Sequence, residues 1–251
     1  MLYILIFIIG LIFGSFAGLI IHRLHKKQKG IWFGRSKCPK CKHELGMIDL
    51  IPLVSYLISG FKCRYCKKRI SAFYPLIELV MGGMFVLTAF LVGIYAINLL
   101  AFYLLVTFVF VALTIYDFLY KEIPDEIVLP AFFVSFLFLG INGVHSFTSL
   151  VVGVSLPVVF FSILFFGSKG KWLGGGDIRI GALMGVLLGW PNILIGLFLG
   201  YLLGAMFSLT GLMTKKLTRK SQIPFAPFLL IGTYIAMFWG KEIVSWYLNI
   251  I

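Results

Sequence analysis

The chain has 251 residues, of which 61% are hydrophobic and 12% charged, and its mean hydropathy is +1.04. Soluble domains carry roughly twice that share of charged residues, so this composition excludes a soluble globule. The net charge is +13, from 22 Lys and Arg against 9 Asp and Glu. On a soluble chain this balance would indicate nucleic-acid binding. Here the basic residues gather in loops between apolar runs, so we expect no nucleic-acid partner.

Apolar runs long enough to cross a hydrocarbon core of ~30 Å recur along the whole chain. They predict an all-α fold, a polytopic membrane helix bundle of about eight transmembrane helices. A turn at Trp190-Pro191-Asn192 divides one long apolar run into two spans. We expect a first transmembrane helix (1–21), a polar loop (22–71) and a transmembrane bundle (72–251). In chain order the spans are 2–21, 72–93, 97–117, 126–142, 147–166, 178–190, 191–213 and 225–246.

The positions of Lys and Arg predict the topology. Most of them lie in residues 22–70, and basic loops stay on the cytoplasmic side of a membrane. With eight spans, both termini then lie outside. The first segment lacks a basic stretch before its apolar run and a cleavage site after it, so we expect an anchor rather than a signal peptide. The basic loops would contact anionic lipid at the inner leaflet. The remaining basic residues are Lys121, Lys169, Lys171, Arg179, Lys215, Lys216, Arg219, Lys220 and Lys241.

Four cysteines form two C-x-x-C pairs inside the first basic loop: Cys38-Pro-Lys-Cys41 and Cys63-Arg-Tyr-Cys66. Two such pairs at this separation are typical of a tetrahedral four-thiolate zinc site. A cytoplasmic location supports this prediction because thiols stay reduced there. Such a closed site is structural, so zinc would fold a loop that has too little apolar content for its own core. Redox dithiols or unmetallated cysteines are the alternatives. His43 lies between the pairs, and we expect it to be solvated.

Carboxylates inside or at the rim of a membrane bundle are expensive and therefore indicate function. Asp117 ends the third span, and Asp177 opens the sixth after a run of three glycines. Both are expected at the cytoplasmic rim, on different helices. Two carboxylates close together in a low-dielectric site cannot both ionise easily, so one keeps its proton and the other acts as a base toward water. That is the chemistry of an aspartyl protease.

Other roles for these acids stay open on this reasoning. Asp177 could cap its helix, Asp117 could pair with Lys121, and Asp125 fits a capping position after Pro124. Membrane carboxylates also serve as proton relays, so a zinc-regulated transporter is an alternative from a different class of protein.

At these residues the sequence resembles the type IV prepilin peptidases. Gly174-Gly-Gly-Asp177 matches the Gly-x-Gly-Asp motif of that family, and Asp117 with Ile123-Pro124-Asp125 resembles the segment of its first aspartate. The resemblance continues in order along nearly the whole chain. It includes Gly14-Ser-Phe16, His22-Arg-Leu24, Asp49–Tyr56, Tyr74–Glu78 and Ile223–Phe228. Gly18 stands where the family usually carries Asn, and Ala226 where it usually carries Gly.

The resemblance implies a bacterial inner-membrane enzyme that cleaves the basic leader of prepilins or pseudopilins on the cytoplasmic side. Asp117 and Asp177 would be its catalytic pair. It also implies N-methylation of the new N-terminus with S-adenosylmethionine, and cleavage without methylation is the alternative. Glu78, set in an apolar span, is a weak candidate for the methyl-donor site. Gly196, Gly200 and Gly204 recur at four-residue spacing, which favours close packing of helices over substrate recognition.

Overall fold

The computed structural model describes residues 1–27, 35–171, 173–218, 221 and 223–249. Within these ranges every regular element is a helix, and the only β pairing is two isolated bridges, which confirms the all-α prediction. The predicted basic residues Arg219 and Lys220 lie outside the described residues.

Each of the eight predicted spans corresponds to one long helix. Six of them are long and apolar enough to cross a membrane, which confirms a multi-pass protein. These six are α1 (Leu2–His25), α3 (Phe73–Val92), α4 (Ile97–Tyr120), α6 (Phe147–Gly167), α8 (Ile193–Met213) and α9 (Ala226–Leu248). The other two, α5 (Asp125–Ile141) and α7 (Gly175–Leu188), have only 17 and 14 residues, so eight crossings stay a prediction. The predicted turn at 190–192 separates α7 from α8.

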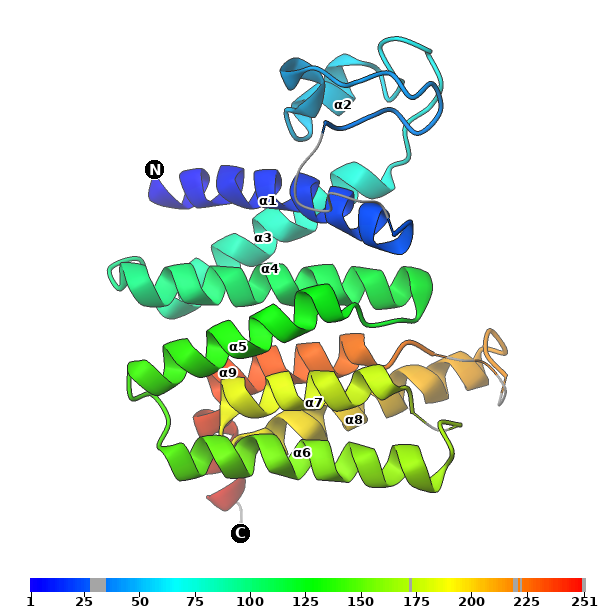
Figure 1. Ribbon diagram of the computed structural model, residues 1–251. Helices are drawn as coiled ribbons and strands as arrows, with labels where there is room; N and C mark the ends of the chain where they lie inside the picture. The colour runs from blue at the N-terminus through cyan, green and yellow to red at the C-terminus, as the bar shows by residue number, and fades with distance from the viewer. Residues whose placement is uncertain (28–34, 172, 219–220, 222, 250–251) are drawn as a thin grey trace. The chain divides into compact units, whose positions relative to one another are not determined.

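The chain forms two compact units, Met1–Ala112 and Leu113–Ile251, with the boundary inside α4. The first unit contains α1, α3 and the loop between them, in which η1 (Met47–Leu50) and α2 (Val54–Ile58) are short helices (Figure 1). Glycines allow α1 and α3 to pack closely. A Cβ atom on Gly14 would lie 2.6 Å from the Cα of Glu78, and one on Gly10 would lie 2.7 Å from the Cα of Gly82.

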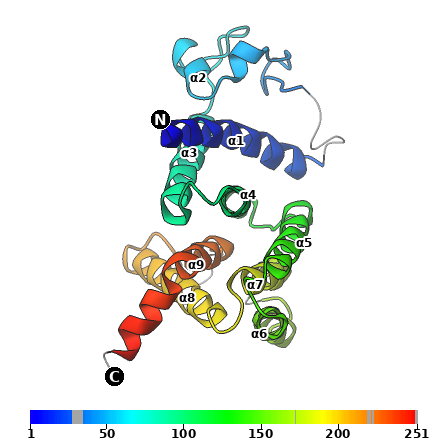
Figure 2. The same ribbon diagram turned by 90° about the vertical axis from the view of Figure 1, so that its left-hand side faces the viewer.

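In the second unit α7 lies among the other helices and is buried along much of its length. It packs against α5, α6, α8 and α9, and Figure 2 shows α5, α7 and α6 side by side and α8 against α9. The glycines of α8 serve this packing: a Cβ on Gly200 would lie 2.9 Å from Leu229, and one on Gly196 would lie 2.5 Å from Leu188. The helix-packing interpretation of this glycine series is therefore confirmed. The central place of α7 fixes the position of Asp177 near its start.

Candidate metal centre and aspartate cavity

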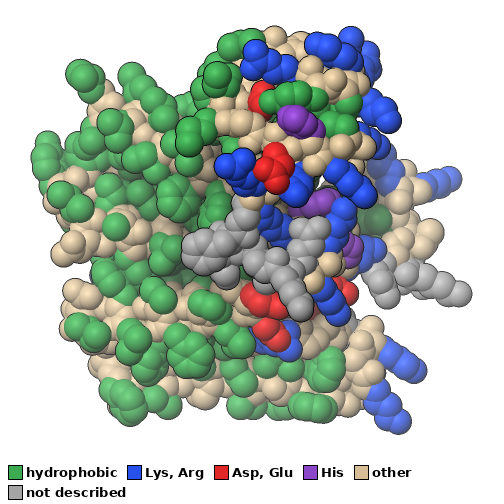
Figure 3. Space-filling view, turned by 45° about the horizontal axis from the view of Figure 1, so that its top comes forward, with side chains coloured by type: hydrophobic (Ala, Val, Ile, Leu, Met, Phe, Trp, Pro, Cys, Tyr) green, Lys and Arg blue, Asp and Glu red, His purple; other side chains and the backbone are tan. Residues whose placement is uncertain are grey.

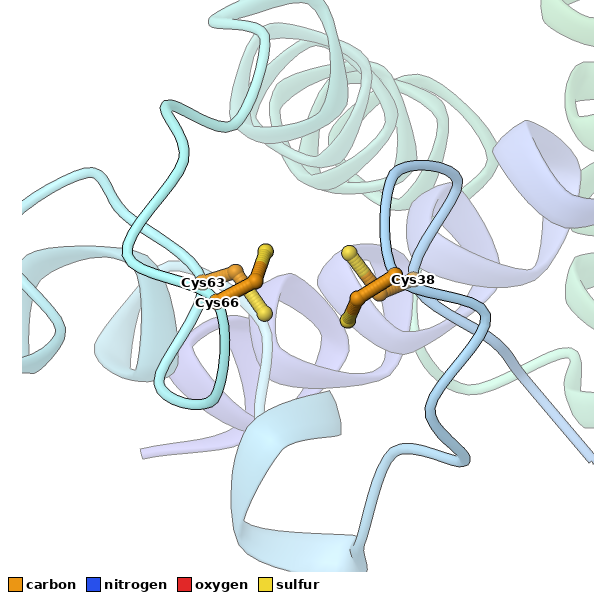
Figure 4. Close-up of side chains that lie close together, drawn as sticks. Cys38, Cys63 and Cys66 are labelled. Atoms are coloured by element: carbon orange, nitrogen blue, oxygen red, sulfur yellow. The ribbon is translucent and has the colours of Figure 1, made fainter.

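Two turns in the first unit carry the four cysteines and have the same hydrogen-bond pattern. The N–H of Lys42 donates to the carbonyl of Cys38, and that of Lys67 donates to the carbonyl of Cys63, each at 2.9 Å. Both lysines adopt left-handed backbone conformations, with φ of 59° and 57°. Such a turn bends the two thiols of each pair toward the same side. Figure 4 shows the sulfurs of the two turns facing one another.

The four sulfur atoms lie within 4.8 Å of one another, and together they could hold a metal ion. In a tetrahedral site with Zn–S bonds of ~2.3 Å, the sulfurs are about 3.8 Å apart, so this donor set fits zinc. Burial opposes ionisation of the Cys38 thiol, but the backbone N–H groups of Cys41 and Lys40 lower its pKa to about 7. A thiolate at neutral pH is the form that binds a metal.

Side chains between the turns connect them to each other. The ring of His43 lies 3.7 Å from that of Tyr65, centroid to centroid, and the Tyr65 hydroxyl donates to Asp49 at 3.0 Å. Asp49 also accepts the backbone N–H of Gly46. His43 is exposed, as expected, and is not part of the cluster of metal-ligating atoms. The His43 ring instead packs against Tyr65 and so connects the two halves of the loop.

Glu78 links this loop to the membrane helix that follows it. The side chain is buried, and its carboxylate accepts the backbone N–H of Leu53 at 2.9 Å and a hydrogen bond from Ser15. Sequence patterns could not predict the Leu53 contact, because any residue except proline can supply a backbone N–H donor. Gly18, where the family usually has Asn, lies beside Tyr74, and a Cβ there would make an ordinary contact of 3.5 Å.

The second unit brings Asp117 and Asp177 to one cavity of about 1160 Å³. Asp117 lies in the last turn of α4 and Asp177 in the first turn of α7, and both side chains are buried. The cavity is lined by polar and charged side chains as well as by the glycine run 174–176. Two residues far apart in sequence, which the motifs singled out separately, are thus neighbours in one site.

A backbone N–H group holds one oxygen of each aspartate. Ala226, the first residue of α9, donates to Asp117 Oδ2 at 3.2 Å, and Gly174 donates to Asp177 Oδ2 at 3.1 Å. Asp177 is not the N-cap residue that the capping alternative expected, since Gly174 occupies that position, but from the first turn its side chain accepts the Gly174 N–H and stabilises the start of α7. Because position 226 acts through its backbone, alanine in place of the family's usual glycine leaves this contact intact.

The glycine run also allows the start of α7 to approach the segment that follows α4. A Cβ on Gly176 would lie 2.6 Å from a side-chain carbon of Ile123, so a larger residue would push the start of α7 away from the segment after α4. Nearby, Arg179 forms an ion pair with Asp125 at 2.7 Å. Asp125 makes no side-chain cap on α5, which differs from the capping expectation, because Pro124 occupies the cap position and Asp125 is the first residue of the helix.

Tyr201 is a cavity residue that the sequence analysis missed. Its hydroxyl oxygen is buried and has no hydrogen-bond partner among the described residues, and it interacts electrostatically with Asp177. The ring is held between Phe161 and Phe225, at centroid distances of 6.4 and 5.0 Å. In the sequence Tyr201 is one aromatic residue in a long apolar run, so no pattern distinguished it.

The segments that carry the two sites each match the model of a known protein family. A model of the bacterial peptidase A24 N-terminal domain matches residues 8–92, which include the four cysteines. A model of the type IV leader peptidase family matches residues 103–209, which include both aspartates. The chain belongs to the type IV leader peptidase family.

Relatives that align with nearly the whole chain support this family membership. The chain is 32% identical to the "Prepilin leader peptidase/N-methyltransferase" of Aeromonas salmonicida (strain A449) over 98% of its own length and 94% of the relative's. Its identity to the protein of the same name in Bacillus subtilis (strain 168) is also 32%, over 98% and 97%. The Pseudomonas aeruginosa protein of that name is 32% identical over 96% and 92%. No solved structure matches the chain.

Proposed function

We propose that this chain cleaves the leader peptide of prepilins or pseudopilins at the cytoplasmic face of the bacterial inner membrane and N-methylates the new N-terminus. The observation that carries the proposal is that one cavity receives both Asp117 and Asp177 in a member of the type IV leader peptidase family. The relatives are named for both activities. The transporter alternative is not favoured, because this family is a peptidase family.

Asp117 and Asp177 would act as one catalytic unit. The ionised carboxylate removes a proton from water, and the water oxygen attacks the scissile carbonyl carbon while the carbonyl π electrons move to oxygen. The protonated carboxyl group then gives its proton to the amide nitrogen, and the C–N bond breaks as the carbonyl re-forms. Burial of both groups supports the unequal protonation that this step needs. The backbone N–H groups that hold each Oδ2 fix the direction of the carboxylates.

The position of the aspartates at helix ends suits the substrate class. Asp117 is near the end of α4, and Asp177 is at the beginning of α7, so both lie where the chain leaves an apolar segment. A prepilin has its scissile bond between a basic leader and an apolar helix, which is the same boundary. With the basic loops on the cytoplasmic side, both termini are outside and the cavity faces the cytoplasm.

In the first unit, Cys38, Cys41, Cys63 and Cys66 would hold one zinc ion. Zinc would join the two turns and stabilise the loop 22–71, which the sequence predicts between a first helix (1–21) and a transmembrane bundle (72–251). The basic side chains of this loop would meet anionic lipid at the inner leaflet.

The methyl-transfer site is a separate proposal, with Glu78 as its candidate residue. The methyl group would come from S-adenosylmethionine, and the new amine must first lose a proton. Glu78 lies under the cysteine loop, but its carboxylate already holds Leu53. A Glu78→Gln variant that cleaves normally and leaves the product unmethylated would support this role. Loss of both activities, or of neither, would place the methyl-transfer site elsewhere.

The function is tested by co-expression of the full chain with a prepilin and mass measurement of the mature N-terminus. We expect a product shortened by the leader and heavier by one methyl group. Asp117→Asn and Asp177→Asn should each leave the precursor uncut while the protein still inserts. Uncut precursor with the wild-type chain, for a panel of prepilins and pseudopilins, would contradict the proposal.

A further inference from the structure

Residues 47–61, between the two cysteine turns, expose many apolar side chains even though they belong to a polar loop. We call these residues the apolar segment; they include η1 and α2. Met47 and Ile58 are the most exposed, at 91% and 80%, followed by Ile48 and Leu57 at 65% and 64%. Helix α2 buries none of its residues. Water-exposed loops rarely carry so much contiguous apolar surface, so this segment requires a partner.

A hydrogen bond locates the apolar segment relative to a membrane-spanning helix. The N–H of Leu53, the residue before α2, donates to Glu78 at 2.9 Å. Glu78 is the sixth residue of α3, which places it about 8 Å along the helix axis at ~1.5 Å per residue. The residue before α2 therefore lies against the first two turns of α3, a candidate membrane span; both helices are labelled in Figure 1.

The charges around the apolar segment match a lipid surface. Lys62 and Arg64 follow it directly, and further Lys and Arg residues stand next to both cysteine pairs in the sequence. Figure 3 shows Lys and Arg side chains gathered on one side of the molecule. The loop's two acidic side chains are already engaged. Glu44 pairs with Arg35 at 3.2 Å and with Lys37 at 3.3 Å, and Asp49 accepts from Tyr65. The surface presented to a partner is thus apolar and basic, which is the combination that binds anionic membranes.

We propose that the apolar segment is a membrane-docking element, which inserts Met47, Ile48, Leu57 and Ile58 among the lipids of the inner leaflet. The flanking basic side chains bind the anionic headgroups. This inference deepens the lipid contact proposed above and depends on the cytoplasmic location of the loop, not on peptidase activity. Zinc then holds the turns, Glu78 anchors Leu53, and lipid fixes the exposed side of the loop.

A lipid partner is favoured over a protein because the segment is held against a helix that is a candidate membrane span. Its two ends join the cysteine turns, and the Glu78 contact holds its centre beside the first turns of α3, a candidate span. The apolar helix of a prepilin would meet this surface only during turnover. The lipid boundary is present all the time, and exposed Ile and Met side chains would otherwise face water.

The proposal is tested with a photoreactive side chain in the full chain, placed in vesicles of phosphatidylcholine and phosphatidylglycerol. Ile58→p-benzoylphenylalanine reports on the apolar segment. Lys68→p-benzoylphenylalanine is the matched control, since Lys68 is also exposed but lies on the second cysteine turn. We expect crosslinks to lipid acyl chains several-fold more often from position 58 than from position 68. Vesicles of phosphatidylcholine alone should reduce the yield at position 58.

Bound metal is measured on both proteins, because loss of metal reveals a misfolded loop. If Ile58→p-benzoylphenylalanine loses its metal, the photoreactive residue is placed at Met47 and the measurement is repeated. Equal acyl-chain labelling at positions 58 and 68 would overturn the proposal. So would crosslinks from position 58 that go to a co-reconstituted prepilin, or to a second copy of the chain, in place of lipid. Because Asp177→Asn carrying the same photoreactive residue should label lipid equally well, failure of the peptidase assignment and failure of lipid docking are distinguishable.

Discussion

The two candidate sites are built in opposite ways. The cysteine site of the first unit comes from two short turns that are close in sequence, and each turn is closed by its own backbone hydrogen bonds. The aspartate cavity of the second unit draws Asp117 and Asp177 from different helices, and the N–H of Ala226 on a third helix holds Asp117. A local site can form from its own segment plus a metal, whereas a cavity of this kind exists only when distant helices pack. The two sites should therefore fail under different perturbations.

The largest effect is expected from the aspartates. Asp117→Asn and Asp177→Asn should each lower the rate of prepilin cleavage by more than about 10³-fold, because the two groups act as one unit. Metal content and protease resistance of residues 22–71 should not change. Initial rates in detergent and zinc analysis of the same samples provide the measurement. Near wild-type cleavage by either variant would refute the catalytic pair.

The converse perturbation is Cys38→Ser. It should release the metal ion and open new protease sites inside 22–71, since the loop has little apolar core of its own. Acidification should act in the same direction. The pKa of Cys38 is lowered to about 7 in the metal-free loop, and a bound ion lowers it further, so the stabilisation from the thiolate is present at neutral pH and is lost when protons displace the metal at lower pH. His43→Ala is the control and should keep the metal. New cleavage sites spread over α5–α9 would show that the two sites are not independent.

Alanine substitutions at two glycines, one crowded and one in open space, test how far the cavity depends on helix packing. Gly232 lies on α9, and a Cβ there would meet backbone atoms of Gly200 and Gly196 at 2.6 and 2.7 Å. Gly232→Ala should destabilise the protein by ~1–3 kcal/mol and reduce cleavage, because α9 carries Ala226. Gly167→Ala, where a Cβ would meet nothing within 4 Å, is the matched control. Thermal unfolding in detergent measures both. Equal unfolding temperatures for the two variants would mean that this contact is not limiting.

The smallest effect is expected at the ion pair between Arg179, which lines the cavity, and Asp125. Arg179 and Asp125 form an ion pair whose side chains are 44% and 45% exposed. A double-mutant cycle with Arg179→Ala and Asp125→Ala should give a coupling free energy of at most ~1 kcal/mol, weakened by salt. Asp125→Asn should accordingly retain much more cleavage than Asp117→Asn. A loss at Asp125 as large as that at Asp117 would place Asp125 in the catalytic unit.

The sequence by itself determined the membrane helices, since a run of apolar residues has no other stable state in a bilayer. It also identified the cysteine cluster, because the spacing within each C-x-x-C pair specifies a local turn. It singled out Asp117 and Asp177, because a carboxylate at the end of an apolar run is costly in a membrane and therefore indicates a function. Only the tertiary structure decided which groups meet. It brought the aspartates and Tyr201 to one cavity, supplied Asp117 with a backbone donor from Ala226 and joined Glu78 to Leu53. Contacts with backbone groups and between distant helices depend on how whole helices pack, and a linear pattern of side chains holds no record of that packing.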